Sequence, residues 1–277
     1  MAFKLAMNTG TFNFQSVDLP KAIQAISKGK FTGVNFRDNH IREHLRKGHS
    51  LREIKRLLEE HQLEPVALDA LRDWQEWEKW DSKKRRAYRE TAEFFFDECR
   101  QIGCPCIAAP TFAVKSDLQE DIQNFKSMCE IAKPYGILLA LEFLPWVELR
   151  DVRMAWEVVR RADCENGGLL VDTFHFFKGG SKIEDFREVP VEKIFLIHLN
   201  DAPDLPIDSK VMCFDHRAFP GEGAFPLKGF LDVLILEKKY KGWISLEVLN
   251  QENPKIDYPE IVDRGKRTVA RVLSSYE

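Results

Sequence analysis

Long hydrophobic runs are absent from this 277-residue chain, so no segment has the length needed to span a membrane. The first seven residues also lack the extended apolar region of a secretory signal, and we therefore expect a cytoplasmic protein without membrane contact. An excess of basic residues is absent too, because 41 Lys and Arg face 44 Asp and Glu. This balance argues against nucleic acid as a partner, since proteins that bind nucleic acid usually carry a basic face.

Paired cysteines are likewise missing. The six cysteines include no C-x-x-C pair, and Cys104 and Cys106 lie in an apolar run flanked by proline. In a chain without an export signal, this usage predicts free, buried thiols instead of disulfides. A chain of this length can bury a large core without such cross-links. Linkers and low-complexity segments are absent as well, so we expect one domain over residues 1–277.

The chain does contain a regular alternation of short apolar runs and longer amphipathic runs. Eight such pairs predict parallel strands joined by crossover helices. The runs 137–141 and 194–197 are apolar at every position, which is typical of strands buried on both faces. An open doubly wound sheet could give this pattern, but eight units favour a closed (β/α)₈ TIM barrel. The strands are expected at Phe3–Asn8, Thr32–Phe36, Pro65–Ala70, Cys104–Ala109, Ile137–Phe143, Gly168–Asp172, Lys193–Leu199 and Trp243–Val248.

Local signals fix several helix ends. Ser50 and Glu53 have the spacing of a capping box, and Gly136 stands where a C-terminal cap glycine belongs. The basic cluster 83–86 opens an amphipathic stretch, which favours a solvated helix face over a phosphate site. The helices are expected at Asp18–Lys28, Ser50–His61, Lys83–Ile102, Asp117–Tyr135, Arg150–Ala162, Ile183–Phe186, Leu227–Lys238 and Tyr258–Ser274.

Four consecutive predicted strands, the fifth to the eighth, end in an acid or a histidine. These are Glu142, Asp172, His198 and Glu247. In such barrels the carboxyl ends of the strands carry the working residues and converge on one axis. Each residue alone is more often a rim ion pair or a core histidine. Four at equivalent positions predict one divalent ion, Mn²⁺, Zn²⁺, Mg²⁺ or Co²⁺, because packed carboxylates would otherwise repel each other.

Other side chains are placed to meet a substrate. Arg217 or His216, in the loop after the seventh strand, could bind substrate oxygens, because guanidinium groups donate parallel hydrogen bonds. Pro220–Gly223, in the same loop, reads as a tight turn. Trp74 and Trp146 follow the third and fifth strands and either wall the pocket or pack against a neighbouring loop.

Six segments match a family of known proteins. On them the chain resembles the xylose isomerase-like barrels of AP endonuclease family 2, and within these the inosose (keto-inositol) isomerases of inositol catabolism. The likeness spans nearly the whole chain and is more specific for the superfamily than for the substrate. The segments are Glu64–Leu71, Ile131–Gly136, Ala140–Phe143, Val171–Phe176, Ile197–Asp201 and Asp215–Gly223.

The resemblance implies functions for individual residues. The four strand-end residues above match the metal ligands of the family, and His175 and Arg217 match positions that contact substrate. In related ketose epimerases the two glutamates, here Glu142 and Glu247, also exchange the proton. The expected activity is therefore a metal-dependent isomerisation or epimerisation of a keto-polyol or ketose through an enediolate.

Departures from the family narrow this expectation. The related DNA-repair endonucleases carry histidines where this chain has Asp69–Leu71, Ala109–Thr111 and Arg217, so a three-metal nuclease site is not expected. The second strand ends in Asn35–Arg37, where many isomerases of the group show an acidic residue, and this leaves the exact substrate open.

Three other functions stay open: a ketose 3-epimerase, a dehydratase acting on an inosose or a 3-dehydroshikimate, and a sugar-binding barrel without activity. Binding alone does not need two acid–base carboxylates, which argues against the last. The partner is a small sugar or polyol, and a homo-oligomer is compatible with the sequence. Residues 249–254, after the eighth strand, contain no glycine, so we expect an unphosphorylated substrate.

Overall fold

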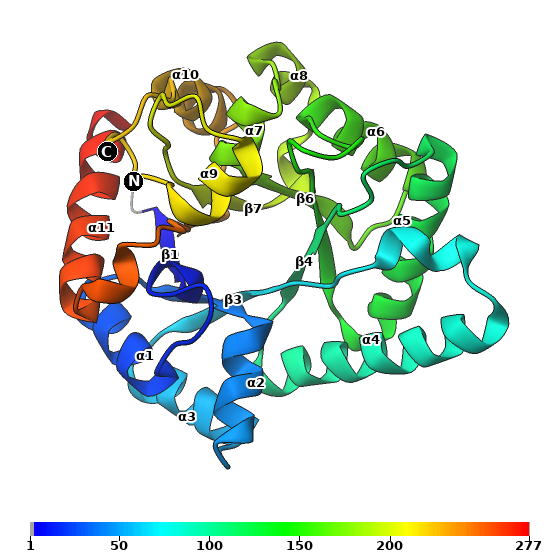
Figure 1. Cartoon of the computed structure of the whole chain (residues 1–277), viewed down its shortest axis with the longest axis horizontal. Helices are drawn as coiled ribbons and strands as arrows, with labels where there is room; N and C mark the ends of the chain where they lie inside the picture. The colour runs from blue at the N-terminus through cyan, green and yellow to red at the C-terminus, as the bar shows by residue number, and fades with distance from the viewer. Residues whose placement is uncertain (1–2, 277) are drawn as a thin grey trace.

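A computed structural model describes residues 3–276 as a closed barrel of eight parallel strands surrounded by helices (Figure 1). The predicted (β/α)₈ TIM barrel is therefore confirmed. Met1, Ala2 and Glu277, at the ends of the predicted domain, lie outside the described residues. The strands are β1 Lys4–Asn8, β2 Gly33–Arg37, β3 Glu64–Asp69, β4 Cys106–Pro110, β5 Leu138–Glu142, β6 Gly167–Asp172, β7 Ile194–Leu199 and β8 Trp243–Leu246.

Helices cover the outside of the barrel (Figure 1). Those that follow the sequence pattern are α1 Leu19–Lys28, α3 Leu51–Glu60, α4 Ser82–Ile102, α5 Leu118–Ala132, α6 Val152–Ala162, α8 Ile183–Glu188, α10 Leu227–Leu231 and α11 Tyr258–Leu273. Three more helices, which the pattern did not predict, are α2 Asp38–Arg46, α7 Thr173–Lys178 and α9 Ser209–Asp215. Short helical turns are η1 Thr9–Thr11, η2 Trp74–Lys79, η3 Lys133–Tyr135, η4 Val191–Lys193, η5 Asp232–Glu237, η6 Asn253–Lys255 and η7 Ser274–Tyr276.

The predicted helix signals are present in the structure. The Ser50 side chain accepts a hydrogen bond from the Glu53 amide, and the Glu53 carboxylate accepts one from the Ser50 amide, which completes the capping box. Gly136 has a φ of 70° after η3, a conformation that costs glycine little. The single helix expected over 227–238 is divided, because α10 continues as the π-helical η5.

Two expectations from composition can also be compared with the structure. All six cysteines are free, as predicted, and all of them are buried except Cys164, which is half-buried. None of the helices formed by residues 3–276 combines the length and apolar character needed to cross a bilayer.

His40, in α2, is a buried histidine that should couple folding to pH. Its Nδ1 lies 2.9 Å from the Thr9 hydroxyl and its Nε2 has no hydrogen-bond partner. Burial, helped by the charge of Arg37, lowers the pKa of His40 from 6.5 to about 4. The unfolded chain therefore takes up a proton first as the pH falls below 6.5, and stability is lost between pH 6.5 and 4.

We expect this one group to remove up to about 3 kcal/mol over that range, since one pKa unit corresponds to about 1.4 kcal/mol. Urea unfolding of EDTA-treated wild type and His40→Asn, compared at pH 7.0, 5.5 and 4.5, measures the effect. Below pH 6.5 the variant should show the shallower pH dependence. Parallel profiles for the two proteins would contradict a buried, neutral His40.

Candidate metal and substrate site

The carboxyl ends of the strands enclose a cavity of about 100 Å³. Because a cavity needs 10–15 Å³ by this measure to hold one water, the space suits one small molecule, on the order of a single ring with its substituents. The cavity is lined by Phe14, Arg37, Asp69, Ala70, Arg72, Pro110, Phe112, Glu142, Leu144, Trp146, His175, Cys213, Phe214, Arg217, Glu247 and Leu249.

The four predicted ligands come together around one histidine nitrogen. His198 Nδ1 lies 3.3 Å from Glu247 Oε2 and 3.9 Å from both Glu142 Oε1 and Asp172 Oδ2. Donor atoms of Glu142, Asp172 and His198 lie within 4.8 Å of one another. Donor atoms of Asp69, His198 and Glu247 form a second group at the same spacing. Strands β3 and β5 to β8 thus deliver five buried ionisable groups to one place.

A hydrogen bond to Asn35 sets the orientation of this histidine. Asn35 Nδ2 donates to Ala67 O and to Asp69 Oδ1, which leaves Asn35 Oδ1 to accept from His198 Nε2 at 2.7 Å. His198 Nε2 is thereby engaged with Asn35, and Nδ1 is the nitrogen that faces the carboxylates. This arrangement is typical of histidines that bind a metal through one nitrogen and donate through the other.

Removing this hydrogen bond should weaken the ion site without touching a predicted ligand. We expect Asn35→Ala to lower the affinity for Mn²⁺ or Zn²⁺ roughly 10- to 100-fold, the usual effect of losing such an outer partner. Titration of the metal-free protein with a competing chelator measures it. Asn39→Ala, a half-buried asparagine of α2 that does not line the cavity, is the control and should bind metal as wild type does. Unchanged affinity in Asn35→Ala would mean that Asn35 does not orient the ligand.

The two glutamates have different surroundings. Glu247 accepts hydrogen bonds from Asn8 at 3.1 Å and from Arg217 at 2.9 Å. No side chain among residues 3–276 donates a hydrogen bond to the Glu142 carboxylate; the nitrogens near it are His175 Nε2 at 3.7 Å and His198 Nδ1 at 3.9 Å.

The pKa values of the two glutamates shift in opposite directions as a result. Burial, with the charges of Glu247 and Asp172, holds the pKa of Glu142 well above its ordinary value. Burial acts on Glu247 in the same direction, but the charges of His198 and Arg217 outweigh it and hold the pKa of Glu247 well below its ordinary value. Glu142 is therefore the more basic carboxylate.

The predicted substrate-binding residues separate into two groups. His175, Arg217 and Trp146 all line the cavity. The His175 ring lies edge-on to Trp146, with 5.6 Å between the ring centroids. Trp74 does not line the cavity, so its predicted place in the wall is corrected. The Trp74 side chain is fully buried, and its indole donates to Pro110 O at 3.0 Å, behind the end of β4.

Arg217 is more deeply embedded than a residue that contacts only substrate. Its Nη1 donates to Asp172 Oδ2 at 2.7 Å and to Glu247 Oε2 at 2.9 Å, while Nε donates to Cys213 O. Cys213, in α9, thus helps to hold the guanidinium against two predicted ligands. The alternative candidate, His216, lies half-buried in a separate surface groove beside Asn250.

The turn at Pro220–Gly223 has a structural function in this chain. Asp201, at the end of β7, accepts hydrogen bonds from the amides of Gly221 at 3.0 Å and Phe225 at 2.9 Å. A Cβ on Gly223 would lie 2.3 Å from Asp201 Oδ1, so only glycine allows this close approach. A phosphate-binding turn needs free amides, and here Asp201 uses that of Gly221.

Sequence reasoning assigned no function in the site to the polar residues of the first three strands. Asn8 ends β1, Asn35 and Arg37 lie in β2, and Asp69 ends β3. Asn8 donates to Asp69 Oδ2 at 2.6 Å, and Arg37 Nη1 lies 3.6 Å from Glu247 Oε1. The rule applied to the fifth to eighth strands, that polar side chains at strand ends meet, would have found them if applied to the first three.

The residues present fit a divalent cation. His198 Nδ1 is buried without a hydrogen-bond partner and faces three carboxylates. Burial alone would lower the pKa of His198, but the surrounding carboxylates, Glu247 first, raise it to about 10. The electrostatic potential at Nδ1 therefore favours an additional positive charge. One nitrogen and several carboxylate oxygens form the donor set that Mn²⁺, Zn²⁺ or Co²⁺ accept.

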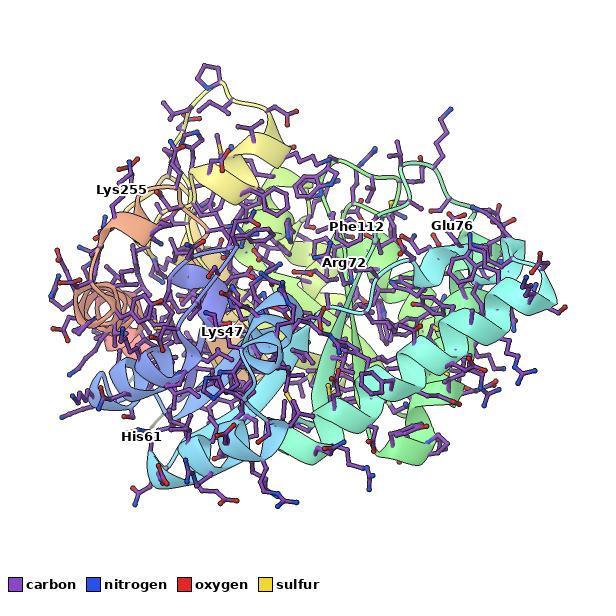
Figure 2. All side chains as sticks on the ribbon, turned by 60° about the horizontal axis from the view of Figure 1, so that its bottom comes forward. Lys47, His61, Arg72, Glu76, Phe112 and Lys255 are labelled. Carbon is purple, nitrogen blue, oxygen red and sulfur yellow. The ribbon has the colours of Figure 1, made fainter. Side chains whose placement is uncertain are left out.

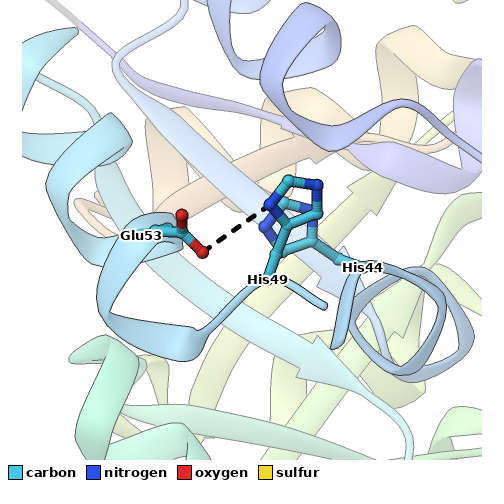
Figure 3. Close-up of side chains that lie close together, drawn as sticks. All are labelled: His44, His49 and Glu53. Carbon is cyan, nitrogen blue, oxygen red and sulfur yellow. Dashed lines mark ion pairs between the residues drawn. The ribbon is translucent and has the colours of Figure 1, made fainter. Parts of the chain in front are cut away.

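A second cluster of metal-binding residue types lies on the outside of the barrel. His44, His49 and Glu53 place donor atoms within 4.8 Å of one another (Figure 3). The two imidazole rings, however, are stacked at 4.3 Å with 13° between their planes. Because the lone pairs lie in the ring planes, they do not converge on one ion. Glu53 Oε2 also accepts the Ser50 amide at 2.6 Å, so this cluster is a stacked pair beside a helix cap.

Comparison with known proteins identifies the class. The chain matches the xylose isomerase-like TIM barrel family over residues 23–268 and therefore belongs to it. It is 28% identical to an inosose isomerase of Halalkalibacterium halodurans, over 99% of this chain and 97% of that protein. It is 32% identical to a 3-dehydroshikimate dehydratase of Pseudomonas aeruginosa, over 84% of this chain but only 36% of that longer protein.

Solved structures agree on the fold. The crystal structure of an IOLI protein with a bound zinc atom superposes with a TM-score of 0.89 at 26% identity and covers 99% of both chains. A D-psicose 3-epimerase from Clostridium cellulolyticum superposes with a TM-score of 0.76 at 15% identity, which shows the shared fold alone. The chain is thus similar along its whole length to isomerases and, along most of it, to the dehydratase.

Proposed function

We propose that this protein is a divalent-metal-dependent isomerase or epimerase of a small keto-polyol or ketose. The observation that carries the proposal is the convergence of Glu142, Asp172, His198 and Glu247 next to the cavity, around a histidine nitrogen without a partner. The similarity to inosose isomerases supports the reaction class.

These four residues would hold one Mn²⁺, Zn²⁺, Mg²⁺ or Co²⁺ ion. When bound, such an ion supplies a Lewis acid for the carbonyl and neighbouring hydroxyl oxygens of a hydroxy-ketone. His198 is already oriented for this by Asn35, whose Oδ1 engages Nε2.

Glu142 is the group that removes the proton from the carbon beside the carbonyl. It lines the cavity, receives no side-chain hydrogen bond from the described residues, and is the more basic glutamate. Glu247, held by Asn8, Arg37 and Arg217, faces the same space from β8 and returns the proton on the other side. Return to the adjacent carbon gives the isomer, and return to the opposite face gives the epimer.

His175 and Arg217 position the substrate. Burial lowers the pKa of His175 to about 4, so the imidazole is neutral at pH 7 and can donate to or accept from a hydroxyl. Arg217 supplies charge where an oxyanion develops, which stabilises the transition state. Trp146 closes the wall beside His175.

The test is a screen of keto-inositols and ketoses in D₂O, followed by NMR with the metal-loaded protein. At least one of these hydroxy-ketones should exchange its α-hydrogen with solvent. The exchange should stop after chelation with EDTA and should be absent in Asp172→Ala. The proposal fails if no hydroxy-ketone exchanges at full metal occupancy.

A dehydratase is the second candidate, favoured by the 32% identity to a 3-dehydroshikimate dehydratase. Both reactions begin when Glu142 removes a proton, and they differ in the second step. Loss of a β-hydroxyl as water would create an enone with a new ultraviolet absorption. Isomerisation leaves the composition of the substrate unchanged, so one absorbance measurement beside the NMR assay distinguishes the two.

A further inference from the structure

Two arginines stand on the same wall of the cavity, on the side formed by the ends of β2 and β3. Arg37 is 8% exposed, and its Nε is buried without a hydrogen-bond partner. Arg72 is exposed at the rim. Burial lowers the pKa of Arg37; the charges of Glu247 and Asp69 oppose this, and the charge of Arg72 adds to it, so the two guanidinium groups act on each other.

Both arginines rest on aromatic rings at the entrance. Arg37 Cζ lies 4.0 Å from the centroid of the Phe14 ring, and Arg72 Cζ lies 5.5 Å from that of Phe112. Figure 2 shows Arg72 and Phe112 beside each other. Phe112 is 39% exposed although it is a large apolar side chain. An aromatic face holds a guanidinium in place without neutralising its charge.

Arg72 forms no ion pair with any carboxylate among residues 3–276, although many of the other arginines in that range do. Its backbone is fixed nonetheless, because the Arg72 carbonyl accepts a hydrogen bond from the Tyr88 hydroxyl. The Leu71 amide, one residue before, donates to Ala108 O at 2.9 Å. The backbone of Arg72 is therefore held in place on the cavity rim, and its side chain carries a charge without an ion pair among residues 3–276.

The charges inside the cavity balance one another without Arg72. Four carboxylates lie in or against the cavity, those of Asp69, Glu142, Asp172 and Glu247. Arg37, Arg217 and the divalent ion of the proposed function balance these four negative charges. Among the described residues that line the cavity, Arg72 is then a positive charge without a matching negative one, so a ligand with one negative charge would complete the balance.

We propose that the substrate carries a carboxylate, which Arg72 and Arg37 bind at the cavity mouth while its hydroxy-ketone part lies beside Glu142 and His198. This inference rests on the proposed function and narrows its substrates to hydroxy-keto acids. Guanidinium groups bind carboxylates through parallel, charge-assisted hydrogen bonds. Arg37 Nε supplies a buried donor that no protein group uses.

A carboxylate fits these groups better than a phosphate. A phosphate monoester carries up to two negative charges at pH 7, whereas Arg72 is a single unmatched cation. Phosphate sites in these barrels use free backbone amides after the seventh or eighth strand. Here the Gly221 amide already donates a hydrogen bond to the Asp201 carboxylate. The segment between β8 and α11 contains no glycine, and the first glycine after β8 is Gly265, inside α11.

The test compares pairs of compounds that differ in the carboxylate alone. Fructuronate is compared with fructose, and 3-dehydroshikimate with its carboxamide, using the metal-loaded full chain. Turnover or deuterium exchange should favour the acid of a pair roughly 10- to 100-fold in kcat/KM, the effect of one hydrogen-bonded charge. Arg72→Gln should remove this preference by raising KM for the acid, with kcat within about threefold of wild type.

Arg153→Gln, an exposed arginine on α6, is the matched control and should keep the preference. Titration calorimetry with the acid provides a readout that does not depend on turnover, and Arg72→Gln should weaken binding by the same factor. If wild type uses the neutral compound as well as the acid, or Arg72→Gln still prefers the acid, the carboxylate site is refuted while the proposed function stands. If no compound exchanges at full metal loading, both fail.

Discussion

Replacing Glu142 by glutamine is expected to remove nearly all turnover and to leave most of the metal bound. Glutamine keeps the shape and one oxygen donor but takes up no proton at neutral pH. The loss should reach at least the 10²- to 10⁴-fold typical of general acid–base catalysis. Steady-state kinetics with the metal content measured on the same sample gives the result. Glu148→Gln, an exposed glutamate after β5, is the control and should retain full activity.

Glu247→Gln should also remove nearly all turnover, but with a different signature. Glu247 is held by Asn8 and Arg217, whereas no side chain among residues 3–276 donates to Glu142. If Glu142 starts the reaction, Glu247→Gln should still exchange the substrate α-hydrogen with D₂O without forming product, and Glu142→Gln should do neither. Turnover within a few-fold of wild type in either variant at full metal loading would reduce that glutamate to a ligand.

Metal content is expected to fall from about one ion per chain to a small fraction in Asp172→Ala and in His198→Ala. Each variant removes a donor that is nearly or fully buried, so no solvent-exposed group replaces it. Elemental analysis after dialysis against Mn²⁺ or Zn²⁺ measures the loss. His216→Ala is the matched histidine control, because His216 lies outside the cavity.

Asp172 also caps α7 and accepts a hydrogen bond from Arg217, so removing its side chain could disturb the fold. Asp172→Asn keeps the hydrogen bonds to the α7 amides and separates loss of the ligand from loss of structure; circular dichroism of both variants completes the check. If both alanine variants bind metal as tightly as wild type, the ligand assignment is wrong.

The barrel could be predicted because its strands are buried on both faces. Runs such as 137–141 and 194–197 admit no polar residue until the strand ends, so each strand boundary is visible in the sequence. Helices α2, α7 and α9 were missed because they lie in the segments that follow strands, where site residues interrupt the apolar spacing. His175 lies in α7 and Cys213 in α9.

The site could be predicted in part, for a similar reason. An acid or a histidine directly after an apolar run is visible in the sequence, so the four predicted ligands at the ends of β5 to β8 could be named, and the structure brings them together. Asn8 and Asn35 are neutral, and the sequence does not indicate which groups a neutral amide side chain in a strand will contact. The two tryptophans show that the same position in the sequence pattern can lead to different environments in the fold. Trp74 and Trp146 follow strands in the same way, yet one is core and the other lines the cavity, because only packing with Pro110 and His175 decides between them.

The closing of the barrel also has a consequence for the order in which the protein can fold. Strand β8 pairs with β1 from Lys4 and Trp243 to Met7 and Leu246, and Glu247 follows directly. The hydrogen bond between Asn8 and Glu247 joins residues 239 positions apart. Contacts of such long range form late, since a loop of nearly the whole chain must close first. A ribosome must therefore release almost the entire chain before Glu247 can form its hydrogen bond with Asn8. A fluctuation that opens only the seam between β1 and β8 would abolish activity before the rest of the barrel unfolds.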